Sequence, residues 1–123
     1  MNARKGDDLR IRTKAFALDI IHFYSSLAKS ELTQVLGRQL LRAGTSVGAH
    51  YREACRSRSR AEFVSKIEGG LQELDETAYW LELLADAGAA PPARVALLLE
   101  EANQLTAVLI ASVRTAKSRN GLH

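Results

Sequence analysis

Residues 36–53 read LGRQLLRAGTSVGAHYRE, and after a short polar break the chain continues with SRAEFV at residues 59–64. At about 100° per residue, one side of a helix through the first stretch carries only apolar side chains. They are Leu36, Leu40, Ala43, Val47, Tyr51 and Ala54. Arginines occupy the opposite side, so this stretch predicts an amphipathic helix that packs one face into a helical core.

Capping residues predict the ends of this helix and of the one before it. Lys29 and Ser30 make a turn, and the Ser30 hydroxyl is placed to cap a second helix that runs to about Arg56. The first helix is expected to begin near Asp7 or Asp8, because carboxylates are favourable at a helix N-terminus.

Similar signals bound two further helices. After a break at Ser57, Ser59 and Glu62 form a capping-box pattern, Ser-x-x-Glu, which predicts the start of a third helix. Gly88 is expected to end that helix, and Pro92 is placed to open a fourth, whose apolar periodicity runs over residues 95–117.

Apolar side chains recur at helical spacing in the other three segments as well. The expected core residues are Leu9, Phe16, Ile20, Phe23, Tyr24 and Leu27, then Phe63, Ile67, Leu71, Leu74, Ala78, Leu81 and Ala85, then Leu98, Ala102, Leu105, Leu109 and Val113. Short connections join antiparallel neighbours, so the sequence predicts one all-α domain over residues 1–123, an antiparallel up-down-up-down four-helix bundle. Residues 1–6 and 118–123 are expected to be disordered tails.

Three glycines lie along the flank of the second helix, Gly37, Gly44 and Gly48. Each costs about 1 kcal/mol relative to alanine inside a helix. Their presence predicts that another helix passes too close to tolerate a Cβ, the alternative being that they only loosen an exposed helix.

The same region resembles the four-helix-bundle proteins of the 23S rRNA intervening-sequence family, also called the S23 ribosomal protein family. The matching residues are Leu36, Gln39, Leu40, Arg42, Ala43, Ser46, Val47, Glu53, Glu62 and Phe63. The chain departs from the family pattern at residues 50–54, where members commonly carry Asn-Ile-x-Glu-Gly. The resemblance implies a helical bundle that assembles as a ring-shaped homopentamer. It also implies a relation to the accessory variability protein of diversity-generating retroelements, a basic ring that accompanies a reverse transcriptase and its RNA.

Composition restricts the class of protein. The N-terminus lacks the apolar core of a secretory signal, no segment matches the roughly eighteen uncharged apolar residues of a membrane span, and a single cysteine excludes an internal disulfide. These features favour a cytoplasmic protein without membrane attachment. Cys55 is expected to be an inert packed thiol.

No pattern of catalytic or metal-binding residues stands out. His50 and Glu53 have the reverse order of the Glu-x-x-His found in metal-binding bundles, and His22 has no close acid in sequence, so both histidines are expected to be solvated or packed. Phosphate-loop, hydrolase and zinc motifs are missing, and the arginine-to-histidine spacing of HEPN nucleases does not occur. We therefore expect a non-enzymatic protein with no cofactor and no metal.

Charge is segregated along the chain, although the net charge is only +3. Residues 38–60 hold six arginines and one glutamate, whereas residues 62–86 hold seven acids and one lysine. The arginines Arg38, Arg42, Arg52 and Arg56 fall on one face of the second helix over about 27 Å, and Arg58 and Arg60 continue them into the turn. This row predicts phosphate contacts with RNA or DNA of low sequence specificity. The alternative is a solvated face that pairs with the acids of the third helix.

Two further surfaces follow from the same helical geometry. Trp80, Leu83, Leu84, Leu99 and Ile110 lie outside the predicted core stripes, which favours a subunit interface over a broad core contact. In a bundle of four helices both termini lie at one end, so the basic residues near them predict a second basic patch there.

Three functions remain open on the sequence alone. The preferred one is an oligomer, expected to be a pentamer, that binds nucleic acid or a nucleoprotein such as a reverse transcriptase complex through its basic helix. The second is a structural or protein-binding adaptor whose arginines form salt bridges. An enzyme with a site assembled between subunits is the third.

Overall fold

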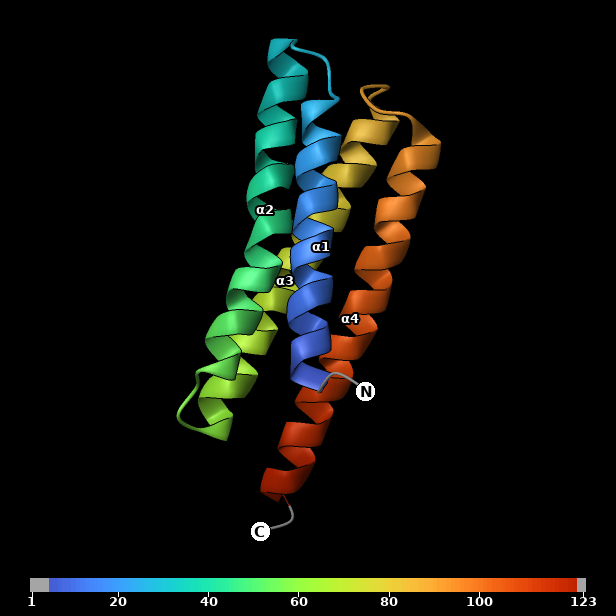
Figure 1. The fold of residues 1–123 in the computed structure, drawn as a ribbon. Helices are drawn as coiled ribbons and strands as arrows, with labels where there is room; N and C mark the ends of the chain where they lie inside the picture. The colour runs from blue at the N-terminus through green and yellow to red at the C-terminus, as the bar shows by residue number, and fades with distance from the viewer. Residues whose placement is uncertain (1–4, 122–123) are drawn as a thin grey trace.

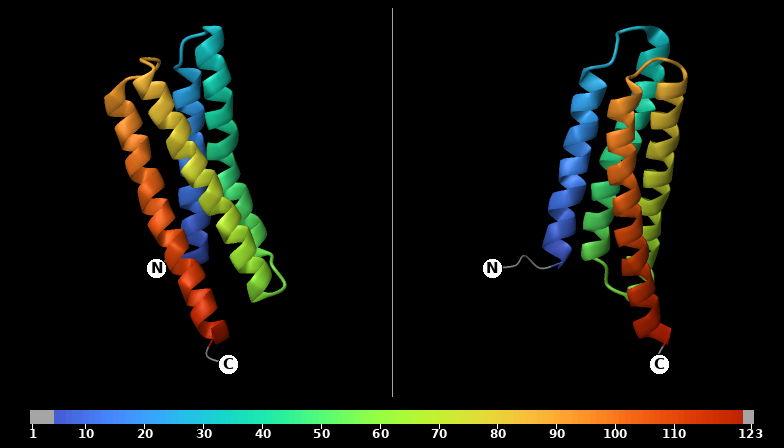
Figure 2. Two further views of the ribbon diagram at one scale, coloured as in Figure 1. Left: turned by 180° about the vertical axis from the view of Figure 1, so that it is seen from behind. Right: turned by 90° about the vertical axis from the view of Figure 1, so that its right-hand side faces the viewer.

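A computed structural model of the chain contains four helices, described here over residues 5–121 for the backbone and 8–118 for the side chains. The helices are α1 (Lys5–Ser25), α2 (Glu31–Cys55), α3 (Arg60–Asp86) and α4 (Pro92–Gly121). They run up, down, up and down, so both chain ends and the α2–α3 turn lie at the same end of the bundle (Figures 1 and 2). The predicted all-α antiparallel bundle is confirmed.

The predicted helix starts coincide with N-caps. The Ser30 hydroxyl accepts a hydrogen bond from the Thr33 amide at 3.3 Å, and the Ser59 hydroxyl accepts one from the Glu62 amide at 3.1 Å. Each satisfies one amide that the first turn of its helix leaves free. The Glu62 carboxylate accepts from the Arg58 amide at 3.0 Å, one residue earlier than in the usual capping box.

The α3–α4 turn is built as its sequence predicts. Gly88 has a φ of 72°, and two amides return to the last turn of α3, Ala89 to the Leu84 carbonyl at 2.8 Å and Gly88 to the Ala85 carbonyl at 3.0 Å. This is the Schellman arrangement, whose left-handed residue is normally glycine. Pro92, which has no amide hydrogen to satisfy, is the first residue of α4.

The chain ends differ in part from the expectation of disordered tails. The backbone is helical at residues 5–6 and 118–121, and α1 therefore begins before the predicted start at Asp7 or Asp8. Residues 1–4 and 122–123 lie outside the described part of the chain.

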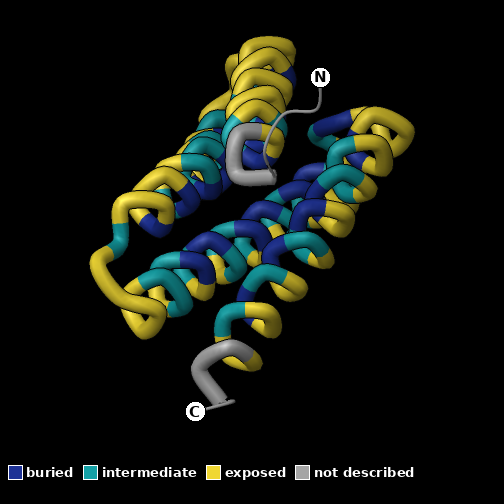
Figure 3. The backbone as a smooth tube through the Cα atoms, turned by 60° about the horizontal axis from the view of Figure 1, so that its bottom comes forward, coloured by how far each residue is buried: buried dark blue, intermediate teal, exposed yellow. Residues whose placement is uncertain are grey.

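The core stripes of α1, α2 and α4 are confirmed, since nearly all of the predicted side chains are buried there and only Tyr24, Leu36 and Leu98 are half-buried. In Figure 3 the buried residues face the bundle axis and the exposed ones face outward. The stripe of α3 is rotated relative to the prediction. Its buried residues are Ile67, Gly70, Leu74, Thr77, Leu81 and Leu84.

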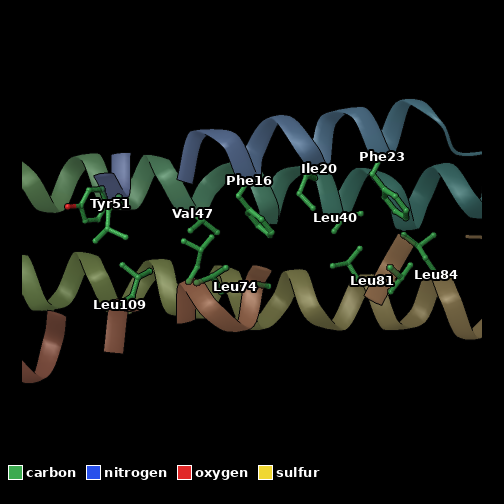
Figure 4. Close-up of a cluster of buried hydrophobic side chains, with 14 of the residues drawn as sticks. Phe16, Ile20, Phe23, Leu40, Val47, Tyr51, Leu74, Leu81, Leu84 and Leu109 are labelled. Carbon is green, nitrogen blue, oxygen red and sulfur yellow. The ribbon is translucent and has the colours of Figure 1, made fainter. Parts of the chain in front are cut away.

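This rotation has a physical reason. α3 packs against both α2 and α4, and small residues on the α2 side are buried that a search for apolar side chains does not count. Thr77 is fully buried because its hydroxyl donates to the Glu73 carbonyl at 2.7 Å, which satisfies its polar atom. Leu84 lies on the same side as Thr77, in the core beside Leu81 and Phe23 (Figure 4).

The flank glycines of α2 do admit a neighbouring helix, which is α1. A Cβ placed on Gly44 would lie 2.8 Å from Cγ1 of Ile20, and one on Gly37 would lie 3.0 Å from Cδ1 of Tyr24. Such distances are shorter than carbon atoms tolerate, so glycine lets α1 and α2 approach closely.

α4 is the least covered helix. α1 and α4 share the smallest interface in the bundle, held by Arg12, which pairs with Glu101 at 3.2 Å, and by Arg94, which donates to the Ser26 hydroxyl at 2.8 Å. By length and composition the segment Pro92–Ser118 could cross a membrane, with a mean hydropathy of 1.3, which the sequence analysis did not predict. Its apolar character also serves the core, because Val95, Ala102, Leu105, Leu109 and Val113 are buried in it.

Candidate nucleic-acid interface

The arginine row lies on the outer face of α2. Arg38, Arg42, Arg52 and Arg56 are all exposed, opposite the buried stripe, and Arg58 and Arg60 are exposed in the turn and at the start of α3. The eighteen-residue step from Arg38 to Arg56 corresponds to about 27 Å along the helix axis. The row is long enough to meet several phosphates of one strand.

Arg42 differs from the other five arginines because it is paired with α3. Its guanidinium contacts the carboxylate of Glu73 at 3.4 Å and that of Glu76, and the Trp80 indole donates to the same Glu76 oxygen at 3.2 Å. The hydrogen bond to Glu76, supported by the charges of Glu76 and Glu73, raises the pKa of Arg42 above its ordinary value. The alternative prediction, pairing with the acids of the third helix, therefore holds for this one residue.

The remaining five, Arg38, Arg52, Arg56, Arg58 and Arg60, have no carboxylate within 4.0 Å among the side chains of residues 8–118. The acids nearest the α2–α3 edge are otherwise engaged. Glu53 pairs with Lys66 at 3.1 Å, and Glu73 also lies 3.6 Å from Nε2 of His50. These five guanidiniums keep their hydrogen-bond donors available to a ligand.

Four of the arginines gather at one end of the bundle. Arg52, Arg56, Arg58 and Arg60 surround the α2–α3 turn, which lies at the same end as the last turns of α4 (Figure 1). Together with the exposed Arg114 of α4 they form what we call the basic end. Among the described side chains, Asp8, Glu53, Glu62 and Glu68 are the acids of this end, and Lys117 pairs with Glu68 at 3.6 Å.

The predicted second basic patch is part of this same surface and is smaller than expected. Arg12 is engaged by Glu101, whereas Lys14 and Arg114 are exposed. The side chains of Arg4, Lys5 and Arg119 lie outside the described residues.

The sequence analysis missed a pocket at the basic end. The α2–α3 turn and the last turns of α4 extend past the start of α1 (Figures 1 and 2), and an open pocket of about 570 Å³ lies there. Its lining includes Leu9, Tyr51, Phe63, Arg58, Arg60 and Thr115, which come from all four helices and the turn. We call it the end pocket. Tyr51 and Phe63 were assigned to the core from their spacing, and no local pattern relates either of them to the arginines.

Cys55 also lines the end pocket and is exposed, so the expectation of a packed thiol is wrong. Its neighbour Ala54 occupies the buried position of that helical turn instead. His22 is exposed, and His50 is half-buried against Gly69 with its Nδ1 atom buried and without a hydrogen-bond partner. Among the described residues, no three His, Cys, Asp or Glu side chains meet in a way that could hold a metal ion.

The predicted subunit interface needs one correction. Leu84 is fully buried in the core of its own bundle, because α3 is rotated toward α2, so it is not a surface residue. Trp80, Leu83 and Leu99 are half-buried, and Ile110 is 37% exposed in a groove between α3 and α4.

Other apolar residues are more exposed than these. Tyr79 contacts the Trp80 ring edge-on, with ring centroids 5.3 Å apart, and is 55% exposed. The antiparallel register of Arg42 with Glu76 places Val35, seven residues before Arg42, beside Leu83, seven residues after Glu76. Val35, Leu32, Tyr79, Trp80 and Leu83 thus define an apolar patch across the upper α2–α3 edge, and Ile11, Leu18 and Ile21 are exposed on the outer face of α1.

Comparison with known proteins agrees with this fold. Residues 7–111 match the family described as 23S rRNA-intervening sequence protein. A crystal structure of a protein of unknown function from the S23 ribosomal protein family of Bacteroides thetaiotaomicron has a TM-score of 0.84 and 32% identity, covering 89% of this chain and 98% of that one. No curated protein matches the chain significantly. From its helical arrangement and these matches, the chain belongs to the 23S rRNA-intervening sequence protein family.

Proposed function

We propose that this protein is a non-enzymatic, self-associating helical bundle that binds the phosphate backbone of RNA or DNA, alone or within a nucleoprotein, through the arginines of α2 and the basic end. The observation that carries the proposal is the set of five exposed guanidiniums without a carboxylate partner among the described side chains. Unpaired arginines are suited to phosphate, because their planar donors match its oxygens and each contact releases counterions.

Two further observations support the proposal. The family is named for sequences that interrupt 23S rRNA genes, and the similar crystal structure comes from a family named for a ribosomal protein. The arginines also lie on convex helix and turn surfaces, which favours contacts to the backbone over reading of base edges. Retroelement accessory proteins of this family associate with a reverse transcriptase and its RNA, and a nucleoprotein of that kind is a suitable partner.

Self-association is proposed from the exposed apolar patch of Leu32, Val35, Tyr79, Trp80 and Leu83. Aromatic and aliphatic side chains in one patch are typical of the centre of a protein interface. A ring, expected to be a pentamer, would repeat the arginine row around its circumference and increase the number of phosphates that one strand meets. We place this assembly in the cytoplasm and assign it no metal or cofactor.

The adaptor function is the second candidate, and the pairing of Arg42 with Glu73 and Glu76 favours it. In that case the arginines would serve contacts between helices or subunits. Nucleic-acid retention then would not depend on Arg52 and Arg56.

Binding of a labelled RNA strand, followed by fluorescence anisotropy over a range of salt concentrations, separates the two functions. The test variant is Arg52→Gln with Arg56→Gln, and the matched control is Lys14→Gln with Lys29→Gln, which removes the same charge from exposed residues elsewhere. We expect the wild type to bind with an affinity that falls steeply with salt. The arginine variant should lower the slope of log K against log salt by about 0.7 for each lost contact to a single strand.

The control variant should change the salt slope far less. Equal slopes for the wild type and the arginine variant, with equal affinity, would reject the arginine row as the binding surface. If the arginine variant changes mass in solution, the arginines act in assembly and the adaptor function is favoured.

A further inference from the structure

The end pocket combines features that separately recognise the parts of a nucleotide. Its volume, about 570 Å³, lies within the range of sites for small ligands and cofactors. It is open to solvent at the basic end, where the first turn of α1 does not cover the α2–α3 turn (Figure 1). A ligand that is bound along the arginine row therefore reaches its mouth.

The inner wall of the pocket is apolar and partly aromatic. Leu9 and Ala54 are 3% and 1% exposed, Tyr51 is 5% exposed, and Phe63 is half-buried. Flat aromatic surfaces favour stacking with a base, and this contribution tolerates any base because every base has a π-face. A phosphate alone would gain nothing from such a wall.

Hydroxyl groups line the pocket beside these apolar side chains. The Ser59 oxygen accepts from the Glu62 amide and keeps its own hydrogen to donate, while the Ser112 hydroxyl donates to the Val108 carbonyl at 3.2 Å and keeps lone pairs to accept. Thr115 has no hydrogen-bond partner among the described residues. Donors and acceptors are thus both present for the polar edge of a base.

The mouth of the pocket is cationic. Arg58 and Arg60 line it, and neither guanidinium is paired with a described carboxylate. The nearest acid in sequence, Glu62, has a carboxylate oxygen that already accepts from the Arg58 amide at 3.0 Å. Arg52 and Arg56 continue the positive charge along α2 beyond the pocket, which suits a ligand with several phosphates in a row.

We propose that the end pocket binds one unpaired nucleotide of a single strand, with the base against Tyr51 and Phe63 and its phosphate on Arg58 and Arg60. This inference rests on the proposed function and adds that the preferred ligand is single-stranded. A base in a duplex must first leave its stack and its partner, which costs a few kcal/mol, whereas an unpaired base enters without that cost. It also revises the sequence analysis, in which no aromatic residue accompanied the arginines.

The test compares three labelled ligands of equal phosphate number on the wild-type protein: a single strand, the same strand without bases, and a duplex whose two strands together carry that number. We expect the base-bearing single strand to bind about tenfold more tightly than the abasic strand, because each stacked base contributes appreciably to affinity. The duplex should bind no better than the abasic strand.

A pair of matched substitutions on α4 locates the effect. Ala116→Leu fills the pocket, whereas Ala111→Leu makes the same change at an exposed position that does not line it. Ala116→Leu should remove the preference for bases and leave the affinity for the abasic strand and its salt slope unchanged. Ala111→Leu should alter neither quantity.

Cys55 supplies an independent measurement, because it is the single cysteine of the chain and lines the pocket. The base-bearing strand should slow its reaction with a maleimide reagent more than the abasic strand does at equal occupancy. Equal affinities for the strands with and without bases would overturn the nucleotide pocket and leave the salt-dependent binding of the proposed function intact. Absence of binding to all three ligands at low salt would instead overturn the proposed function and this inference together.

Discussion

Gly44→Ala tests the close approach of α1 and α2, on which the packing of the bundle depends. The added Cβ would lie 2.8 Å and 2.9 Å from the two γ carbons of Ile20, which is fully buried. Ile20 is β-branched and has one strongly preferred rotamer in a helix, so the two helices must separate. Overpacking of this kind costs about 1–3 kcal/mol, and the upper part of that range applies here.

Alanine also gains about 1 kcal/mol of helix propensity over glycine, which offsets part of the cost. We expect a net loss of about 1–2 kcal/mol in the free energy of unfolding. For a chain of this length that loss lowers Tm by about 3–10 °C. Thermal unfolding followed by circular dichroism at one fixed protein concentration measures it, because self-association makes Tm depend on concentration.

Gly70→Ala is the matched control on α3. Its added Cβ would meet Cβ of His50 at 3.6 Å and Cδ1 of Leu109 at 3.7 Å, which are ordinary contact distances. Only the propensity gain remains, so Tm should rise, by up to about 3–5 °C. If both substitutions raise Tm, the glycine of α2 is not required by the approach of α1 and the packing argument is refuted.

Three further predictions concern a cap, an ion pair and an interface. Ser59→Ala should lower the free energy of unfolding by about 1 kcal/mol in urea titrations, since the Glu62 amide loses its acceptor, and Ser59→Asp should retain most of the stability. Arg42→Gln should cost no more than about 1 kcal/mol, because the ion pair is exposed, and less at high salt. The pKa of Arg42 is raised by folding, so its contribution is present at all pH below its ordinary 12.5 and is lost only above it; a difference between wild type and variant that changes between pH 7 and pH 9 would contradict this assignment. Trp80→Ala should lower the mass measured by light scattering if the apolar patch joins subunits, and a monomeric wild type would end that proposal.

The ends of the helices follow from the sequence because they depend on interactions within a few residues. Ser30 and Ser59 cap amides three residues ahead, and Gly88 returns its amide to the turn that precedes it. These contacts need no other helix, so the pattern of capping residues predicts them. The buried stripes of α1, α2 and α4 follow for a related reason, since a 3.6-residue period places their apolar side chains on one face.

The tertiary structure decided which chemically similar residues differ in role. Arg38 and Arg42 lie on the same face of α2, yet only Arg42 meets carboxylates of α3, because the antiparallel register brings Glu73 and Glu76 to its level. The burial of Leu84 depends in the same way on the rotation of α3 against its two neighbours. Rotation and register are set by the fit of whole helix surfaces, which no local pattern contains.

The end pocket is likewise a property of the tertiary structure alone. Its lining comes from residues far apart in sequence, such as Leu9, Phe63 and Thr115, and it exists because the α2–α3 turn and α4 extend past the start of α1. Periodicity identified Tyr51 and Phe63 as apolar positions and charge identified the arginines as a row. Only the packing of four helices of unequal reach brings them to one opening.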